Sequence, residues 1–302
     1  MAQMLEDLRL QSGQKVLEIG AGTGYNAALM AFVVGPDRVT SIDVDMHVLS
    51  EAWDHIRRFP DRRVCLKHAD GRLGHAEAAP YDRILATAST PDLEPAWLGQ
   101  LRPDGLLSAP LNLAPGVSYV VCGTVRDGIF TGRLVRPAYF MPLRHESEAG
   151  GDDEADKSLA ATSSQAIAAP WANLFERRRP RVGWARFIHS ITFYAWLRGL
   201  EVRQRRSADQ QLLYGIQQPA GPCCWLGAQE WYIDGDEARQ MGLDVWRAFL
   251  DAGGPWPTEF RLRAAPHGQL TPQAHREVYV KQGPRCQQLW ELIEPRDRPA
   301  WL

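Results

Sequence analysis

Residues 16–25 read VLEIGAGTGY, and this stretch constrains the fold more than any other part of the chain. Its apolar first half is typical of a buried strand. Three glycines follow, Gly20, Gly22 and Gly24, and then an apolar run that predicts a helix. Glycine lets the backbone turn tightly and come close to a ligand, because no Cβ stands in the way. A strand, a glycine turn and a helix together form the entrance to a nucleotide-type site in an open α/β sheet.

The spacing of the glycines narrows the choice of ligand. It is G-x-G-x-G rather than the dinucleotide pattern G-x-G-x-x-G, and no Lys-Ser or Lys-Thr follows, which excludes a P-loop. Glu18 stands two residues before the first glycine. A carboxylate there would repel a pyrophosphate but suits a ligand that carries an amino group and a sulfonium. We therefore expect S-adenosylmethionine, with a plain structural turn as the alternative.

A second acidic residue strengthens this expectation. The predicted strand at residues 38–44 contains Asp43, about 20 residues beyond the glycine turn, where this fold class places an acid for the ribose hydroxyls. A carboxylate can accept hydrogen bonds from two hydroxyl groups at once. The two signals at this separation predict a cofactor site more strongly than either one alone.

The order of the predicted elements indicates the fold class. Strands and helices alternate to about residue 107, which predicts a parallel sheet. Asp127-Gly128 then separates two β-prone runs, residues 118–124 and 130–135, and Asp-Gly in that position predicts a hairpin. A mostly parallel sheet that ends in an antiparallel hairpin is the Rossmann-like α/β layout of class I methyltransferases.

Composition excludes several classes of function. The net charge of −2 gives no electrostatic reason to expect a nucleic-acid partner. No apolar run reaches the roughly 18 residues of a membrane helix, and the first residues have no signal-peptide core. We therefore expect a cytoplasmic protein without a membrane partner. The five cysteines are scattered and lack CxxC spacing, so we expect no metal site.

Residues 5–145 resemble the protein-L-isoaspartate (D-aspartate) O-methyltransferase family. The resemblance rests on the motifs VLEIGAGTGYNAALMA (16–31), RVTSIDVD (38–45), ADGRLG (69–74), APYDRILATAST (79–90), LRPDGLLSAPL (101–111) and RPAYFMPLR (136–144). It implies methyl transfer from S-adenosylmethionine to a carboxylate of L-isoaspartyl or D-aspartyl residues in proteins or peptides. The methyl ester would then collapse to a succinimide, from which the isoaspartyl residue can return to aspartate, and damaged proteins would be repaired in this way. Two alternatives stay open: methylation of Asp in a dedicated precursor peptide, and a non-catalytic module that binds S-adenosylmethionine or a peptide.

The resemblance also implies roles for individual residues. The residues expected at the methionine end of the cofactor are Glu18, Gly20, Gly22 and Gly24, with Asp43 at the ribose, Asp70 and Gly71 at the adenine, and Thr87 and Ala88 near the transferred methyl group. No catalytic acid or base is expected, because the accepting carboxylate is already ionised at neutral pH.

The chain is expected to divide into three parts. These are a methyltransferase domain at residues 1–145, an acidic and polar linker at 146–169, and a smaller α+β domain of unknown role at 170–302, with its tryptophans in the core. The last part loosely resembles extensions of actinobacterial-type homologues. The family carries a Ser-Gln-Pro-type motif ahead of the first strand, and nothing in residues 1–15 matches it. We therefore expect either a late start or a rebuilt substrate side, and slow methylation of isoaspartyl peptides by the chain as written.

Overall fold

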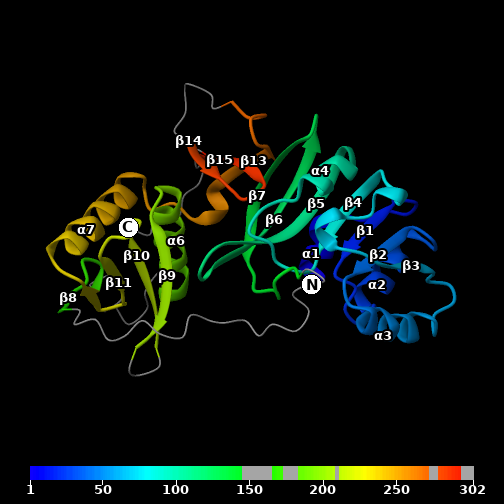
Figure 1. Ribbon diagram of the computed structural model, residues 1–302, viewed down its shortest axis with the longest axis horizontal. Helices are drawn as coiled ribbons and strands as arrows, with labels where there is room; N and C mark the ends of the chain where they lie inside the picture. The colour runs from blue at the N-terminus through cyan, green and yellow to red at the C-terminus, as the bar shows by residue number, and fades with distance from the viewer. Residues whose placement is uncertain (145–164, 173–182, 208–210, 272–277, 294–302) are drawn as a thin grey trace.

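The computed structural model describes residues 1–144, 165–172, 183–207, 211–271 and 278–293. These residues form a ten-stranded sheet and a five-stranded sheet, which lie next to each other along the long axis of the molecule (Figure 1). Within the described ranges, no helix is both long enough and apolar enough to cross a bilayer.

The elements follow one another in an alternating order through the first part of the chain. They are α1 (Ala2–Leu8), β1 (Val16–Ile19), α2 (Tyr25–Val34), β2 (Val39–Asp43), α3 (Met46–Ile56), β3 (Val64–His68), η1 (Gly71–Leu73), η2 (Ala76–Ala78), β4 (Tyr81–Ala86), α4 (Pro95–Gln100), β5 (Leu101–Ala114), β6 (Val117–Arg126) and β7 (Ile129–Pro137). The later elements are β8 (Gln165–Ala168), α6 (Trp184–Leu197), β9 (Glu201–Arg206), β10 (Leu212–Gln217), β11 (Cys223–Leu226), β12 (Glu230–Ile233), α7 (Asp236–Asp251), η4 (Pro257–Glu259), β13 (Phe260–Pro266), β14 (Val278–Gln282) and β15 (Cys286–Leu292).

Strand β1 lies inside the parallel part of the large sheet. It pairs with β2 on one side and β4 on the other, and β3 and β5 extend the sheet in parallel beyond them. All four residues of β1 are buried, as expected for a strand covered on both faces. The predicted parallel α/β sheet is confirmed.

Strands β5, β6 and β7 continue the sheet in antiparallel order. The turn between β6 and β7 contains Asp127 at φ 52° and Gly128 at φ 73°. Two consecutive residues with positive φ match the type I′ turn, whose twist suits a hairpin. The hairpin predicted from Asp-Gly is therefore confirmed.

Three strands from the last part of the chain extend the same large sheet. Strand β13 pairs antiparallel with β7, with Leu262 opposite Gly132, and β15 and β14 follow it. The predicted boundary at residue 145 therefore does not separate the two sheets. Without β13, strand β7 would be an edge with unpaired N–H and C=O groups, and the added strands pair those groups.

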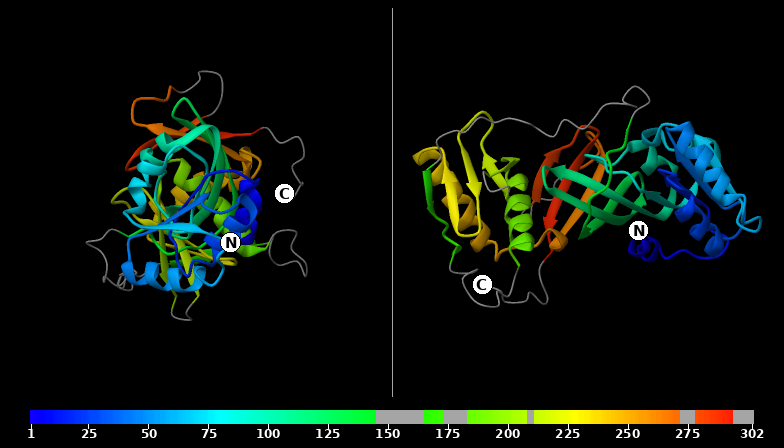
Figure 2. Two further views of the ribbon diagram at one scale, coloured as in Figure 1. Left: turned by 90° about the vertical axis from the view of Figure 1, so that its right-hand side faces the viewer. Right: turned by 90° about the horizontal axis from the view of Figure 1, so that it is seen from below.

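The five-stranded sheet has the order β8-β12-β11-β10-β9, and its strand pairs are antiparallel. Helix α7 contacts three of its strands, and α6 lies between this sheet and the added strands of the large one (Figure 2). Strand β8 lies within the stretch predicted as a linker, and residues 145–164 lie outside the described part of the chain.

Aromatic side chains join the two sheets into one core. From α6, the ring of Phe193 lies 5.3 Å from that of Phe260 on β13 and 5.4 Å from that of Trp290 on β15, between ring centroids. On the other side, Trp171 and Trp231 pack with their centroids 5.0 Å apart. These tryptophans are fully buried, as predicted for the core.

Candidate functional site

A cavity of about 280 Å³ opens at the carboxyl ends of β1, β2 and β4. Open α/β sheets bind their ligands outside the carboxyl ends of the strands, so this cavity is the candidate site. Its described lining consists of Ile19, Gly20, Gly22, Ile42, Asp43, Val44, Asp45, Val48, Gly71, Thr87, Ala88, Met141, Pro142, Leu143 and Arg144.

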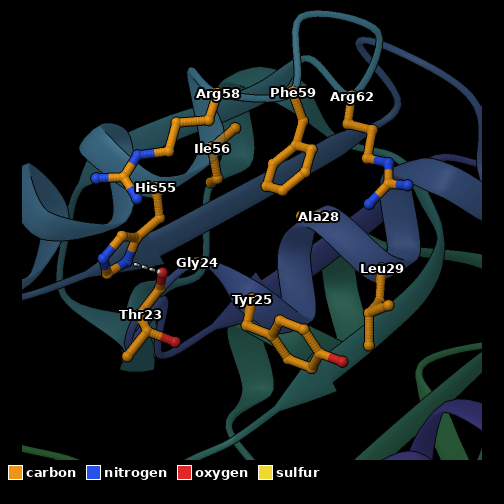
Figure 3. A pocket seen from close by; sticks show the side chains of 10 residues that line it. All are labelled: Thr23, Gly24, Tyr25, Ala28, Leu29, His55, Ile56, Arg58, Phe59 and Arg62. Atoms are coloured by element: carbon orange, nitrogen blue, oxygen red, sulfur yellow. Dashed lines mark hydrogen bonds between the residues drawn. The ribbon is translucent and has the colours of Figure 1, made fainter.

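Larger cavities lie elsewhere, and two of them are well formed. One of about 490 Å³ lies between α2 and the end of α3, where Tyr25, Phe59 and Arg62 surround an apolar hollow (Figure 3). Its described lining includes no residue of a strand. The other, of about 770 Å³, lies between the antiparallel strand β7 and helix α6. Neither cavity opens at the carboxyl ends of the parallel strands.

The first glycine of the turn, Gly20, lies so close to Thr87 that a side chain would not fit there. Gly20 has φ 95°, and a Cβ at this position would collide with the hydroxyl oxygen of Thr87. Gly22 has φ 51°, and a Cβ there would meet no atom within 4 Å. The first glycine therefore allows the turn to pack on the sheet, whereas the second keeps the surface of the cavity open.

Asp43 holds the glycine turn through its carboxylate. Oδ2 accepts hydrogen bonds from the backbone N of Ala21 at 2.9 Å and of Gly22 at 3.4 Å. Oδ1 accepts a third from the backbone N of Asp45 at 3.1 Å. A carboxylate has about four acceptor positions, so it can still accept a hydrogen bond from a ligand hydroxyl. The structure thus gives Asp43 a second task, in addition to the predicted contact with the ribose.

Glu18 lies behind the turn and is absent from the described lining of the cavity. It is fully buried, where Ser41 of β2 donates to Oε2 at 2.5 Å and Asn26 of α2 donates to Oε1 at 2.6 Å. Burial raises the pKa of Glu18 to about 7, against the opposing effect of these two hydrogen bonds. The side chain links β1 to the neighbouring strand and helix.

Two other residues expected at the cofactor also lie outside this lining. Gly24 is the N-cap of α2 and lines the cavity of Figure 3 instead. Asp70 accepts hydrogen bonds from the guanidinium and the backbone N of Arg72, which lower the pKa of Asp70 below its usual value. The next residue, Gly71, does line the candidate site.

Thr87 and Ala88 follow β4 and lie in the lining, as expected for residues near the reacting group. The Thr87 hydroxyl lies 3.0 Å from the carbonyl oxygen of Ile19 and 2.8 Å from that of Gly20. It therefore bonds the end of β4 to the glycine turn at the end of β1.

Residues 141–144 form one wall of the cavity. No site role had been predicted for these residues from the sequence. The backbone N of Ser89 donates to Met141 O at 2.8 Å, and the N of Leu143 donates to Ser89 O at 2.8 Å. These bonds place the end of the tail RPAYFMPLR beside Ala88. The signal was present in the sequence, because this tail is part of the family resemblance, but its position against β4 depends on long-range pairing.

The lining suits an adenosyl ligand with a positive charge. Asp43 and Asp45 supply carboxylate acceptors for hydroxyl groups, and Ile42 and Val48 supply apolar surface for a flat base. Arg144 is the one cationic side chain among the described lining residues. The residues present therefore fit the expected S-adenosylmethionine better than a pyrophosphate, which needs cationic or N–H donors on all sides.

We predict that Thr87→Val loosens the glycine turn. Valine has the same shape but donates no hydrogen bond to the carbonyl groups of Ile19 and Gly20, and a lost hydrogen bond costs about 1 kcal/mol. The free energy of unfolding in urea should fall by that amount. Thr131→Val, at an exposed position on β7, is the matched control and should leave it unchanged. Equal stability of the two variants would contradict the prediction.

Several known proteins are similar to this chain. The family model described as protein-L-isoaspartate(D-aspartate) O-methyltransferase matches residues 1–148. Protein-L-isoaspartate O-methyltransferase of Hyperthermus butylicus is 36% identical over 178 residues, which cover 53% of this chain and 70% of that protein. The same enzyme of Anaeromyxobacter dehalogenans is 37% identical over 147 residues, or 48% and 69%. A solved protein-L-isoaspartate O-methyltransferase aligns with 20% identity and a TM-score of 0.49, covering 87% of this chain and 76% of that one.

Proposed function

We infer the site of methyl transfer from the fact that this chain belongs to the protein-L-isoaspartate(D-aspartate) O-methyltransferase family. The chain is therefore an S-adenosylmethionine-dependent methyltransferase that acts on isoaspartyl residues of proteins. We propose that methyl transfer takes place in the cavity at the carboxyl ends of the parallel strands. The observation that carries it is the contact between Asp43 and the glycine turn, which places a carboxylate at the carboxyl ends of the parallel strands.

Different residues of the cavity would contact different parts of the cofactor. Gly20 and Gly22 would meet its methionine end and Asp43 its ribose. Gly71 would lie at the adenine. Its backbone is held in place by Trp97, which donates from Nε1 to the Gly71 carbonyl oxygen at 2.8 Å. Of the residues expected at the cofactor, Glu18, Gly24 and Asp70 would act from behind the surface, by holding the elements that carry the others.

Thr87 and Ala88 would lie where the accepting carboxylate meets the methyl group. When bound, the sulfonium supplies an electrophilic methyl group. The acceptor is ionised at neutral pH, so the protein has no proton to remove and acts by holding the two reactants in line. Arg144, the one cation among the described lining residues, would attract the acceptor carboxylate into the cavity.

The product explains why methylation serves repair. The oxygen–methyl bond formed on the isoaspartyl carboxylate converts it into an ester. The adjacent backbone nitrogen can then attack the ester carbonyl and expel methanol, which closes a succinimide ring. Water opens the ring at either carbonyl and returns part of the material as ordinary aspartate. We propose damaged proteins of the cytoplasm as the substrates.

We predict that the chain transfers labelled methyl groups from S-adenosylmethionine to an isoaspartyl peptide and not to its aspartyl twin. The two peptides differ only in which carboxylate is free, so the comparison tests recognition of the isomerised bond. Measurable transfer to the aspartyl twin would favour modification of a dedicated peptide. Cofactor binding without transfer to either peptide would indicate a non-catalytic module and overturn the proposed function.

A further inference from the structure

A buried carboxylate connects the segment after β4 with strand β15. Asp92 is fully buried, and its Oδ2 accepts hydrogen bonds from the backbone N of Arg285 at 3.1 Å and of Cys286 at 2.6 Å. Its Oδ1 accepts from Gln288 Nε2 at 2.7 Å and from the backbone N of Leu93 at 2.8 Å. A carboxylate offers about four acceptor positions, so protein donors fill them all. Two of the four donors belong to β15, and a third belongs to Arg285, the residue just before it.

A second contact reinforces the first. The guanidinium of Arg285 forms an ion pair with Glu94, whose side chain is only 4% exposed. Burial raises the pKa of Glu94 above its usual value, and Arg285 opposes that rise. The Sγ of Cys286 also donates to Leu93 O at 3.2 Å. Asp92 and Glu94 thus attach one short segment to a strand that lies about 190 residues later in the chain.

The other end of this segment forms part of the candidate site. We call Thr87–Thr90 the acceptor segment, because Thr87 and Ala88 line the cavity. The backbone N of Thr90 donates to Pro110 O at 3.1 Å, and its hydroxyl donates to Asp92 O at 2.9 Å. The acceptor segment is therefore held by β5 on one side and, through Asp92, by β15 on the other.

We propose that Asp92 and Arg285 are positioning residues for methyl transfer: they use strand β15 to hold the acceptor segment in register with the reacting carboxylate. This inference rests on the proposed function, because that function places the acceptor segment at the methyl group. A displacement of about 1 Å at a reacting centre can cost 100-fold in rate. The last strands of the chain, whose role the sequence left open, thereby become part of the support of the transfer site.

The test compares Arg285→Gln with Arg285→Lys in the full chain. Arg285 is partly exposed, so the glutamine variant removes the charge opposite Glu94 without opening the core. We expect kcat for an isoaspartyl peptide to fall about tenfold, a smaller loss than the limit for a full 1 Å shift. The dissociation constant for S-adenosylhomocysteine should stay within twofold. Arg285→Lys keeps the charge and should restore most of the rate.

Arg261→Gln is the matched control. Arg261 of β13 pairs with Glu291 of β15 at 3.6 Å and lies in the same added strands, and this ion pair does not involve the acceptor segment. This variant should keep the wild-type kcat. If Arg285→Gln lowers the melting temperature while kcat per cofactor-binding molecule stays at the wild-type value, the role of Arg285 is structural and the proposal is refuted.

Amide hydrogen exchange supplies a readout that does not depend on turnover. Peptides that cover residues 87–94 should exchange faster in Arg285→Gln than in Arg261→Gln or the wild type. Equal exchange would contradict the proposal. A wild type that binds cofactor but leaves isoaspartyl peptides unmodified would refute the proposed function instead, and the exchange comparison would still decide whether Arg285 holds the acceptor segment.

Discussion

Asp43→Ala should weaken binding of S-adenosylmethionine and S-adenosylhomocysteine by about 10- to 100-fold. Hydrogen bonds to a charged group contribute roughly 1.5–3 kcal/mol, which corresponds to that range of affinity. The substitution removes the expected ribose acceptor. It also releases the backbone N–H groups of Ala21 and Gly22, which the carboxylate now holds in the glycine turn. Calorimetric titration with S-adenosylhomocysteine measures the loss.

The stability of the variant must be measured alongside its affinity. Because Asp43 bonds to three backbone N–H groups, Asp43→Ala should also lower the free energy of unfolding by about 1–3 kcal/mol. Asp37→Asn is the matched control, since Asp37 is an exposed carboxylate just before β2, at the end remote from the cavity. It should bind cofactor normally. Unchanged affinity in folded Asp43→Ala would show that the ribose is held elsewhere.

Glu18→Gln should stabilise the protein at alkaline pH and leave it nearly unchanged at acidic pH. Burial raises the pKa of Glu18 from 4.5 to about 7 in the folded chain. Between these values the folded state binds the proton that the unfolded state has lost, so stability falls as the pH rises through this window. Above pH 7 the cost of the buried charge reaches about 3 kcal/mol. An uncharged glutamine avoids this cost.

Urea denaturation at pH 4.5, 6 and 8 follows this effect. The difference between Glu18→Gln and the wild type should grow across that range as the buried carboxyl ionises. Glu230→Gln, at an exposed position on β12, is the control and should show no such trend. If the difference in stability between Glu18→Gln and the wild type were the same at all three pH values, the charged Glu18 carboxylate would be stabilised by Ser41 and Asn26.

The parallel part of the fold could be predicted because its signals are local. Each strand is a short apolar run, each helix follows within a few residues, and the Asp127-Gly128 turn determines the hairpin. The position of Asp43 at the site could also be predicted from a local signal. It ends a strand at the expected distance from the glycines. The pairing of β13 with β7 had no such signal, since the paired residues lie about 130 positions apart.

The surroundings of Glu18 show a second limit to what could be predicted from the sequence. Its position next to the glycine turn suggested a contact with the cofactor, but neighbouring residues of a strand point to opposite faces. Ile19 lines the cavity, and Glu18 points to Ser41 and Asn26. Asp92 shows the same limit, because its partners on β15 lie about 190 residues later and no local pattern connects them. A sequence pattern places a residue near a site more readily than it orients the side chain.

The junction between β7 and β13 has a consequence for synthesis on the ribosome. Strand β7 ends at residue 137 and β13 begins at residue 260, so the 122 residues between them must be made before the partner strand emerges. At 5–20 residues per second this takes roughly 6–25 s. During that interval β7 exposes an unpaired edge, and such edges recruit other strands. Nascent chains stalled between these two strands should therefore aggregate or bind chaperones more readily than chains released after β15.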